Sequence, residues 1–219
     1  MNFEQIAFIG ESLGPLFLTD PEQGAGSPLF IALAQMDAHQ AALEWPVFSD
    51  TPAFDVSAAD DITKAVEKCL MNMKIGLNGD FQELIWEYRR LFAVSGSPKP
   101  APPWGSYYTD PEAAICSETT LALRQWLAIN GIGKTDDKKV EDHIGQMLLL
   151  MAWIARQRPE ITGEFLQLHF LPWATHMLQA LQKSTSHPFY NGLAQLCDIC
   201  LTAIRDALRL EVIYPRFYR

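Results

Sequence analysis

The first residues in this sequence whose types and spacing could support catalysis are a serine and the two glycines that flank it. Gly10, Ser12 and Gly14 stand in the run GESLG, which matches the GxSxG pattern of serine hydrolases. In that pattern a sharp turn from a strand into a helix exposes the serine as a nucleophile. The apolar neighbours here, among them Ile9 and Leu13, follow helical spacing instead. We therefore expect Ser12 to have a structural role.

An aspartate beside a histidine suggests a general base and the carboxylate that orients it. Asp142 and His143 are adjacent, however, and adjacent side chains on a helix point about 100° apart, so they cannot form the hydrogen-bonded pair of a catalytic triad. His169 and His176 lie two helical turns apart, whereas metal-binding pairs on one helix favour a spacing of three or four residues. We expect separate structural contacts for these residues and no catalytic or metal site.

The cysteines offer no better case for a cofactor. Cys197 and Cys200 form a CxxC pair, but the pair lies in a helical pattern without a second pair or a nearby histidine to complete four ligands. We expect all four cysteines, which also include Cys69 and Cys116, to be free, buried thiols. Because no Gly-rich phosphate loop occurs either, the sequence predicts no bound cofactor and shows no machinery for nucleotide hydrolysis.

The elements that must position these residues are helices. Apolar residues recur every three or four positions over 62–73, 144–154 and 193–208, which is one face of an α-helix in each case. Alternating patterns are scarce, and the best β-branched stretch, 212–214, is followed at once by Pro215. The sequence therefore predicts an all-α, multi-helix bundle with well over half of its residues helical.

Helix boundaries can be predicted from capping residues, prolines and glycine. Ser57 with Asp60 and Asp80 with Glu83 resemble capping boxes, in which two side chains satisfy each other's backbone N–H groups. The remaining predicted boundaries are a start at Asp110 before Pro111, a left-handed stop at Asn130 and Gly131, breaks at Pro159 and Pro172, and a first-turn proline at Pro188.

The longest gap between helical patterns is a Pro-rich loop over residues 93–110. It holds four prolines and two glycines, and its Trp104, Tyr107 and Tyr108 supply the apolar area that disordered segments lack. We expect an ordered loop. Since one hydrophobic core keeps growing up to roughly 250 residues, residues 1–219 are predicted to form a single domain.

The charge of the chain excludes some partners. The formal net charge is −9, and clustered lysines and arginines of the kind that bind phosphates do not occur, so nucleic acid and anionic membranes are poor partners. An acidic surface favours a cationic partner instead. The first residues lack a basic secretory pattern, and the longest apolar run, 147–155, is short of the roughly 20 residues that a spanning helix needs. We expect a cytoplasmic protein with no integral membrane segment.

Several motifs, taken together in order, resemble the TorD/DmsD family and its DmsD branch in particular. YRRLF at 88–92 ends a predicted helix, PPWGS follows at 102–106, and EDH at 141–143 precedes a helix that carries Leu148 to Trp153. Supporting motifs are TLALRQW at 120–126, FLPW at 170–173 and HPFY at 187–190. The resemblance covers roughly 88–196 well, and the first third only in helical character.

This resemblance implies an all-α chaperone with no chemistry of its own. Its partner would be the twin-arginine signal peptide, or leader, of a molybdoenzyme catalytic subunit resembling dimethyl-sulfoxide or trimethylamine-oxide reductase. The client would be held until its molybdenum cofactor is inserted, before export. The positions that correspond to leader-binding positions of the family are Tyr88, Leu91, Phe92, Pro103, Trp104, Gly105, Ser106, Tyr108, Asp142 and His143.

The types of these residues suit such a partner. A leader brings two guanidinium groups and an apolar stretch, so a receptor needs a carboxylate, an aromatic face and an apolar groove. Asp142 is expected to supply the carboxylate, Trp104 or Tyr108 the aromatic face, and Leu91 with Phe92 part of the groove. Leu91 and Phe92 are equally well explained as core residues, and Trp104 as a plug that fixes the loop to the core.

One departure from the family pattern concerns nucleotides. The family often shows ExPxDH, whereas Lys138 and Val140 stand here where Glu and Pro would be. The weak guanine-nucleotide binding that the resemblance implies is therefore in doubt. Two alternatives to the chaperone remain from the residues themselves: an enzyme, either a serine hydrolase through Ser12 or a nucleotide hydrolase, and a helical adaptor for another protein.

Overall fold

The protein is an all-α bundle. The structure, a computed structural model, describes residues 1–24, 27–47, 56–92, 99–133 and 140–219, and the side chains of 56–58 are outside this description. Most described residues are helical and none lies in a strand, so the predicted fold class is confirmed. The helices are α1 (Phe3–Leu18), α2 (Pro21–Gly24), α3 (Pro28–Gln35), α4 (Ala38–Glu44), α5 (Val56–Leu77), α6 (Phe81–Leu91), α7 (Gly105–Thr109), α8 (Glu118–Ile129), α9 (Ile144–Gln157), α10 (Thr162–Phe165), α11 (Leu171–Ser184) and α12 (Pro188–Ala207).

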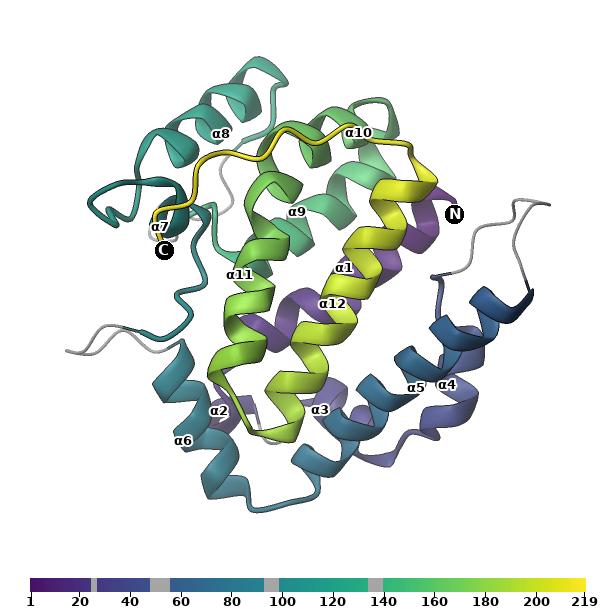
Figure 1. The fold of residues 1–219 in the computed structure, drawn as a ribbon. Helices are drawn as coiled ribbons and strands as arrows, with labels where there is room; N and C mark the ends of the chain where they lie inside the picture. Colours follow the sequence, from purple (N-terminus) through teal and green to yellow (C-terminus); the bar gives the residue numbers. More distant parts are fainter. Residues whose placement is uncertain (25–26, 48–55, 93–98, 134–139) are drawn as a thin grey trace.

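Five long helices form the core. α1 packs along α9, and α12 packs along both α5 and α11, so that α12 lies in the middle of the bundle (Figure 1). The buried apolar side chains form one cluster that draws on helices from both ends of the chain. This single core favours the prediction that residues 1–219 form one domain, which stays a prediction.

The GxSxG run is a helix-packing motif. It lies inside α1, as expected from the spacing of its neighbours, and not at a turn between a strand and a helix. A Cβ atom on Gly10 would lie 2.2 Å from the carbonyl oxygen of Leu148, and one on Gly14 would lie 2.9 Å from Leu149 Cγ. The two glycines therefore let α1 and α9 approach closely, and Ser12 belongs to the same helix turn without the setting of a nucleophile elbow.

The central helix α12 follows its sequence pattern. Pro188 occupies the first turn, as predicted, and the side chain of His187 accepts a hydrogen bond from the N–H of Phe189 at 3.3 Å. Cys197 and Cys200 are fully buried on its inner face, and the indole N–H of Trp45 donates to the sulfur of Cys200 at 3.2 Å. All four cysteines are free, as predicted. The prediction of buried thiols is confirmed for Cys69, Cys197 and Cys200 and is wrong for Cys116, which is exposed.

Most predicted boundaries are confirmed. Asp80 caps α6 by accepting from the N–H of Gln82 at 2.8 Å, and Gly131 adopts a φ of +67° after α8. Pro159 begins a 3₁₀ turn, Pro159–Ile161, after α9, and Pro172 lies in the first turn of α11 after a π-helical segment, Leu166–Phe170. The predicted cap at Ser57 involves a side chain outside the described residues.

The predicted helix start at Asp110 is wrong. α8 begins at Glu118, and Asp110 instead ends α7 and accepts hydrogen bonds from the N–H groups of Glu112 and Ala114. Ala113 and Cys116 have φ values of +59° and +69°, and a right-handed helix cannot pass through such residues. The Pro-rich loop is also less irregular than expected, because α7 lies inside it.

None of the described helices combines the length and the apolar character that crossing a membrane requires.

Candidate peptide-binding site

The Pro-rich loop is fastened to the start of α9 by main-chain hydrogen bonds. The N–H of Ile144 donates to the carbonyl oxygen of Pro103 at 2.8 Å, and the N–H of Gly105 donates to that of Asp142 at 3.1 Å. The Asp142 side chain adds a third bond, in which Oδ2 accepts from the N–H of Ser106 at 2.7 Å. Two of the predicted site segments, about forty residues apart, therefore meet directly. We call these five residues the loop junction.

The carboxylate of Asp142 points into the protein. Asp142 is only 1% exposed. The sequence suggested a carboxylate that faces a guanidinium at the surface, and the buried position of Asp142 does not permit this. Burial raises the pKa of the Asp142 carboxyl, while the backbone N–H and hydroxyl of Ser106 and the hydroxyl of Thr120 work in the opposite direction. In this position the carboxylate fixes the loop to α9.

Gly105, Ser106 and Tyr108 are also buried, because α7 packs on α11. A Cβ atom on Gly105 would lie 2.4 Å from the indole of Trp173, so only glycine permits this approach. Ser106 is fully buried and Tyr108 is 2% exposed, and burial raises the pKa of the Tyr108 phenol far above its usual range. These residues give the loop its shape.

Trp104 and His143 lie between the residues of the loop junction in sequence and are partly exposed. They are paired by an isolated antiparallel bridge, and their rings meet edge to face with 5.6 Å between centroids. His143 also caps α9, because its Nδ1 accepts from the N–H of Gly145 at 3.1 Å. The pair presents an indole and an imidazole at a fixed angle, which suits an apolar or cationic group from a partner.

The third predicted segment is the end of α6, and its predicted site residues lie partly in the core and partly at the surface. Leu91 is fully buried and Phe92 is 5% exposed, so the alternative of core packing holds for both. Tyr88 is half-buried, with its ring 5.5 Å from that of Phe92 and 6.5 Å from that of Tyr190. Of the three predicted site residues here, Tyr88 is the one that can contact a partner without rearrangement of the core.

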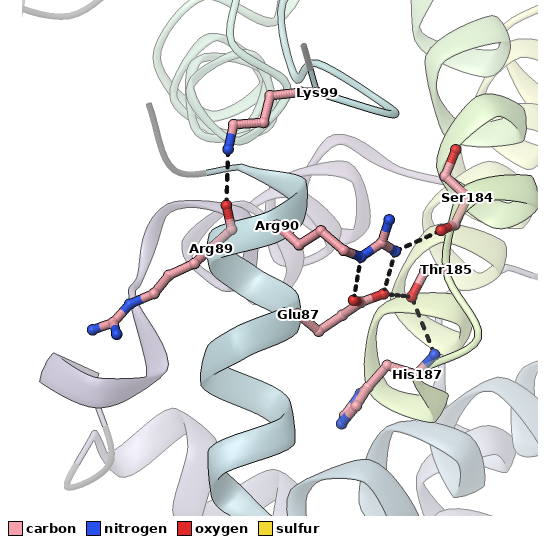
Figure 2. A network of polar contacts seen from close by, with 7 residues as sticks. All are labelled: Glu87, Arg89, Arg90, Lys99, Ser184, Thr185 and His187. Carbon is pink, nitrogen blue, oxygen red and sulfur yellow. Dashed lines mark hydrogen bonds and ion pairs between the residues drawn. The ribbon is translucent and has the colours of Figure 1, made fainter. Parts of the chain in front are cut away.

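A polar network that sequence reasoning missed holds the end of α6 in place. Arg90 donates from Nε and Nη2 to the two carboxylate oxygens of Glu87, both at 2.7 Å, and from Nη2 to the carbonyl of Ser184 at 2.6 Å. The hydroxyl of Thr185 also donates to Glu87 and accepts from the N–H of His187 at 3.2 Å. Figure 2 shows how this network joins α6 to the turn between α11 and α12.

Glu87 stays ionised within this network. Burial alone works to raise the pKa of its carboxyl, since the residue is only 4% exposed, but the hydrogen bonds from Arg90 and Thr185 outweigh burial and lower the pKa. The spacing of Glu87 and Arg90, three residues apart on a helix, was the available signal in the sequence. What it could not reveal was the burial of the pair.

The end of α1 lies between the two parts of the site. The phenol of Tyr88 donates to the carbonyl oxygen of Leu18 at 3.4 Å, and the side chain of Leu18 fills the space beside Gly145, where a Cβ atom would lie 2.6 Å from Leu18 Cγ. Burial and the nearby carboxylate of Asp20 raise the pKa of Tyr88. Asp20, which sequence reasoning did not single out, therefore places negative charge beside the half-buried ring of Tyr88.

Within the described parts of the chain, no group of three or more His, Cys, Asp or Glu side chains is placed to hold a metal ion. His169 packs against the ring of Trp126, and His176 stacks on Phe217, so the two histidines make separate contacts. Lys138, the position of the departure that bears on guanine nucleotides, lies outside the described residues, and that prediction stays a prediction.

Comparisons with known proteins identify the family of the chain. Residues 57–179 match the nitrate reductase delta subunit family. The "Probable Tat proofreading chaperone DmsD" of Haemophilus influenzae is 35% identical over 100% of this chain and 98% of its own. The Tat proofreading chaperone DmsD of Salmonella typhimurium is 33% identical over 99% of this chain and 97% of its own, and the Escherichia coli chaperone protein YcdY is 24% identical over 90% and 91%. The chain therefore belongs to the TorD/DmsD family, as its motifs from Tyr88 onward indicated.

Proposed function

We propose that this chain is a chaperone that binds the twin-arginine leader of a molybdenum-dependent reductase. It would act in the cytoplasm and hold a client of the dimethyl-sulfoxide or trimethylamine-oxide reductase type for cofactor insertion, with no chemistry of its own. The observation that carries the proposal is the similarity to proteins named Tat proofreading chaperone, which extends over nearly the whole of both chains.

The partly exposed residues of the site supply the contacts that a leader needs. Trp104 and His143 offer a rigid aromatic corner, and Tyr88 offers a second ring beside the carboxylate of Asp20. A guanidinium gains from both an aromatic face and a nearby carboxylate. The net charge of −9 adds a long-range attraction for a basic leader.

The buried residues of the predicted site would position these contacts. Asp142 and Ser106 hold the loop that carries Trp104, and Gly105 lets this loop lie against Trp173. The other buried residues of the set are Leu91, Phe92, Pro103 and Tyr108. A role as positioning residues predicts that conservative replacements preserve binding, whereas replacements that move the loop weaken it.

Calorimetry with a synthetic twin-arginine leader peptide tests the proposal. We expect the peptide to bind the wild-type chain and Trp104→Ala to weaken binding about thirtyfold, because truncation of an aromatic hot-spot residue costs about 2 kcal/mol. Trp153→Ala is the matched control, since Trp153 is 46% exposed and lies about 15 Å further along α9 from His143.

Two outcomes would count against the proposal. If the wild-type chain does not bind the leader, the chaperone function is wrong. If the leader binds but Trp104→Ala and the Trp153→Ala control bind it as the wild type does, the leader uses another surface, and the site residues are wrong although the family is right. A second peptide, with both leader arginines replaced by glutamine, measures the contribution of the guanidinium groups to binding. We expect Asp20→Asn to reduce this contribution.

A further inference from the structure

After α12 the chain continues as an extended segment across the bundle. Arg209 turns the chain with a φ of +53°, and residues 210–219, called the tail below, form neither helix nor strand. In Figure 1 the tail is the yellow segment that runs from the end of α12 past α10 and α8 to α7. It therefore ends beside the loop that carries the candidate site.

The end of the tail binds to this region as a peptide would. The N–H of Tyr218 donates to the carbonyl oxygen of Tyr108 at 3.0 Å. The guanidinium of Arg219 donates to the carbonyl oxygens of Asp110 and Pro111 at 3.0 and 3.1 Å, and lies 5.4 Å from the centre of the Tyr107 ring. The receiving residues from the loop and α7 thus hold a cation by carbonyl oxygens and an aromatic face.

An aromatic side chain of the tail is held next to this cation. The ring of Phe217 stacks on the imidazole of His176, with 3.9 Å between centroids and 7° between planes, and a ring nitrogen of His176 lies 2.5 Å from the carbonyl oxygen of Arg219. We call the receiving surface, which consists of Tyr107, Tyr108, Asp110, Pro111 and His176, the tail groove. Its contacts select an arginine two residues after an aromatic residue in an extended chain.

The middle of the tail is largely exposed. Ile213 is 86% exposed and Tyr214 is 50% exposed, so little apolar area is buried there. A pocket of about 410 Å³ adjoins this part, and its lining includes Ile213 and Pro215 of the tail together with Leu168 and Trp173 of the bundle. The tail therefore forms part of the wall of a mostly apolar cavity and does not fill it.

We propose that the tail groove and this cavity form a binding site for an extended peptide that carries an arginine beside apolar residues, and that the tail occupies the site in the absence of a partner. The choice of partner rests on the proposed function: the peptide is the arginine-containing leader of the client. Tyr108 belongs to both the candidate site and the tail groove, so a leader that contacts Trp104 can continue along the groove.

The contacts available in the site favour replacement of the tail by the leader. A leader brings a second arginine and an apolar stretch, which can fill the cavity that the tail leaves open. The tail gives up few buried contacts on release, but as part of the same chain it competes at an effective concentration on the order of millimolar. Such competition multiplies the apparent association constant for the leader by the fraction of time that the site is free of the tail.

The direct test uses the tail itself as the probe. A fluorescent peptide with the sequence of residues 210–219 is titrated with the full chain and with a chain that ends at Leu208, and binding is measured by anisotropy. We expect the shortened chain to bind the peptide at least tenfold more tightly. A peptide with Arg219→Gln should lose most of this binding, whereas Arg216→Gln is the matched control, because the Arg216 guanidinium stacks on Tyr218 within the tail.

Full-length variants test the same inference without the deletion of residues 209–219, which could impair folding. Arg219→Gln with Phe217→Ala should release the tail and raise the affinity for the leader about tenfold, whereas Arg216→Gln should leave it unchanged. The leader should also displace the fluorescent tail peptide from the shortened chain.

The results separate this inference from the proposed function. Equal affinity of the leader for the wild type, the released variant and the shortened chain would overturn the inference and leave the chaperone function intact. Failure of the tail peptide to bind the shortened, folded chain would also overturn it. A leader that binds none of these chains would overturn the proposed function, and with it the identity of the partner proposed for the groove.

Discussion

The carboxylate of Asp142 accepts a hydrogen bond from the backbone N–H of Ser106, 36 residues earlier, with 2.7 Å between the atoms. Both residues are buried, so water cannot replace either partner. The carboxyl group that the family resemblance implies for leader binding here closes a loop. The loop in turn carries Trp104, the largest partly exposed ring of the candidate site.

Asp142→Ala is expected to destabilise the protein by about 1 to 3 kcal/mol, because the N–H of Ser106 would remain buried without an acceptor. Asp142→Asn retains an acceptor oxygen of the same shape and should cost clearly less. Urea unfolding of the two variants measures the difference. If Asn costs as much as Ala, the carboxylate contributes through its charge and the hydrogen bond to Ser106 is not what stabilises the loop.

Two adjacent arginines at the end of α6 should differ sharply in their effect on stability. Arg90→Gln leaves the carboxylate of Glu87, which is 4% exposed, without its cation, and we expect a loss of about 3 kcal/mol. Arg89→Gln is the matched control. Its side chain is 49% exposed in an ion pair with Glu22, so no measurable change is expected.

Thermal or urea unfolding of both variants measures whether Arg90 contributes more to stability than Arg89. Equal stability of Arg90→Gln and Arg89→Gln would mean that the network in Figure 2 does not hold α6 to the turn before α12. Leader binding should follow the same order, because Tyr88 lies on the helix turn that this network fixes.

Sequence patterns were most reliable where one physical cause acts locally. The spacing of apolar residues after Leu193 predicted the buried face of α12, and Pro188 marked its first turn. The start of α8 was missed, because Asp110 before Pro111 satisfies the rule for a helix start while the left-handed backbone at Ala113 and Cys116 has no signature in residue type.

The arrangement of the candidate site residues was anticipated in part, and their role in binding a leader stays a prediction. The resemblance brought the loop and the start of α9 together correctly, but a polar residue is normally expected at the surface, and the inward direction of Asp142 depends on a loop far away in the sequence. The burial of Glu87 has the same origin, since Thr185 and Ser184 come from a turn about a hundred residues later. Local sequence patterns do not predict contacts between segments that are distant in the sequence.

Substitutions in the GxSxG run can test whether it serves helix packing or catalysis. Gly10→Ala would bring a Cβ atom to 2.2 Å from a main-chain oxygen of α9, which cannot move aside as a side chain could. We expect a loss of about 1 to 3 kcal/mol, despite the gain in helix propensity of about 1 kcal/mol. Ser12→Ala in the same helix should change stability by less than about 0.5 kcal/mol.

A serine-reactive phosphonate completes this test, since it labels an activated serine and leaves a structural one unmodified. We expect no labelling of Ser12 in the folded protein. Labelling that Ser12→Ala abolishes would restore the hydrolase alternative, and a neutral Gly10→Ala variant would show that α1 and α9 do not pack through these glycines.

Acid should weaken the turn that leads into α12. Burial lowers the pKa of His187 in the folded protein, although the nearby carboxylates of Glu87 and Glu83 work to raise it. The unfolded chain has a histidine pKa of about 6.5 and therefore binds a proton at a higher pH than the folded protein does. Protonation thus favours unfolding, and the contribution of His187 to stability is present above about pH 6.5 and is lost as the pH falls below that value.

His187→Asn isolates this contribution. Asparagine can still accept the hydrogen bond from the N–H of Phe189 that caps α12, but it does not titrate. Groups that titrate in both proteins, including His169, whose pKa burial also lowers, cancel when the two are compared. We expect the free energy of unfolding of the wild type to fall more steeply between pH 7 and pH 5 than that of the variant, as measured by urea unfolding at several pH values. Parallel curves would show that His187 has the same pKa in the folded and unfolded chains, and a shallower wild-type curve would mean that its folded pKa is raised by the two glutamates.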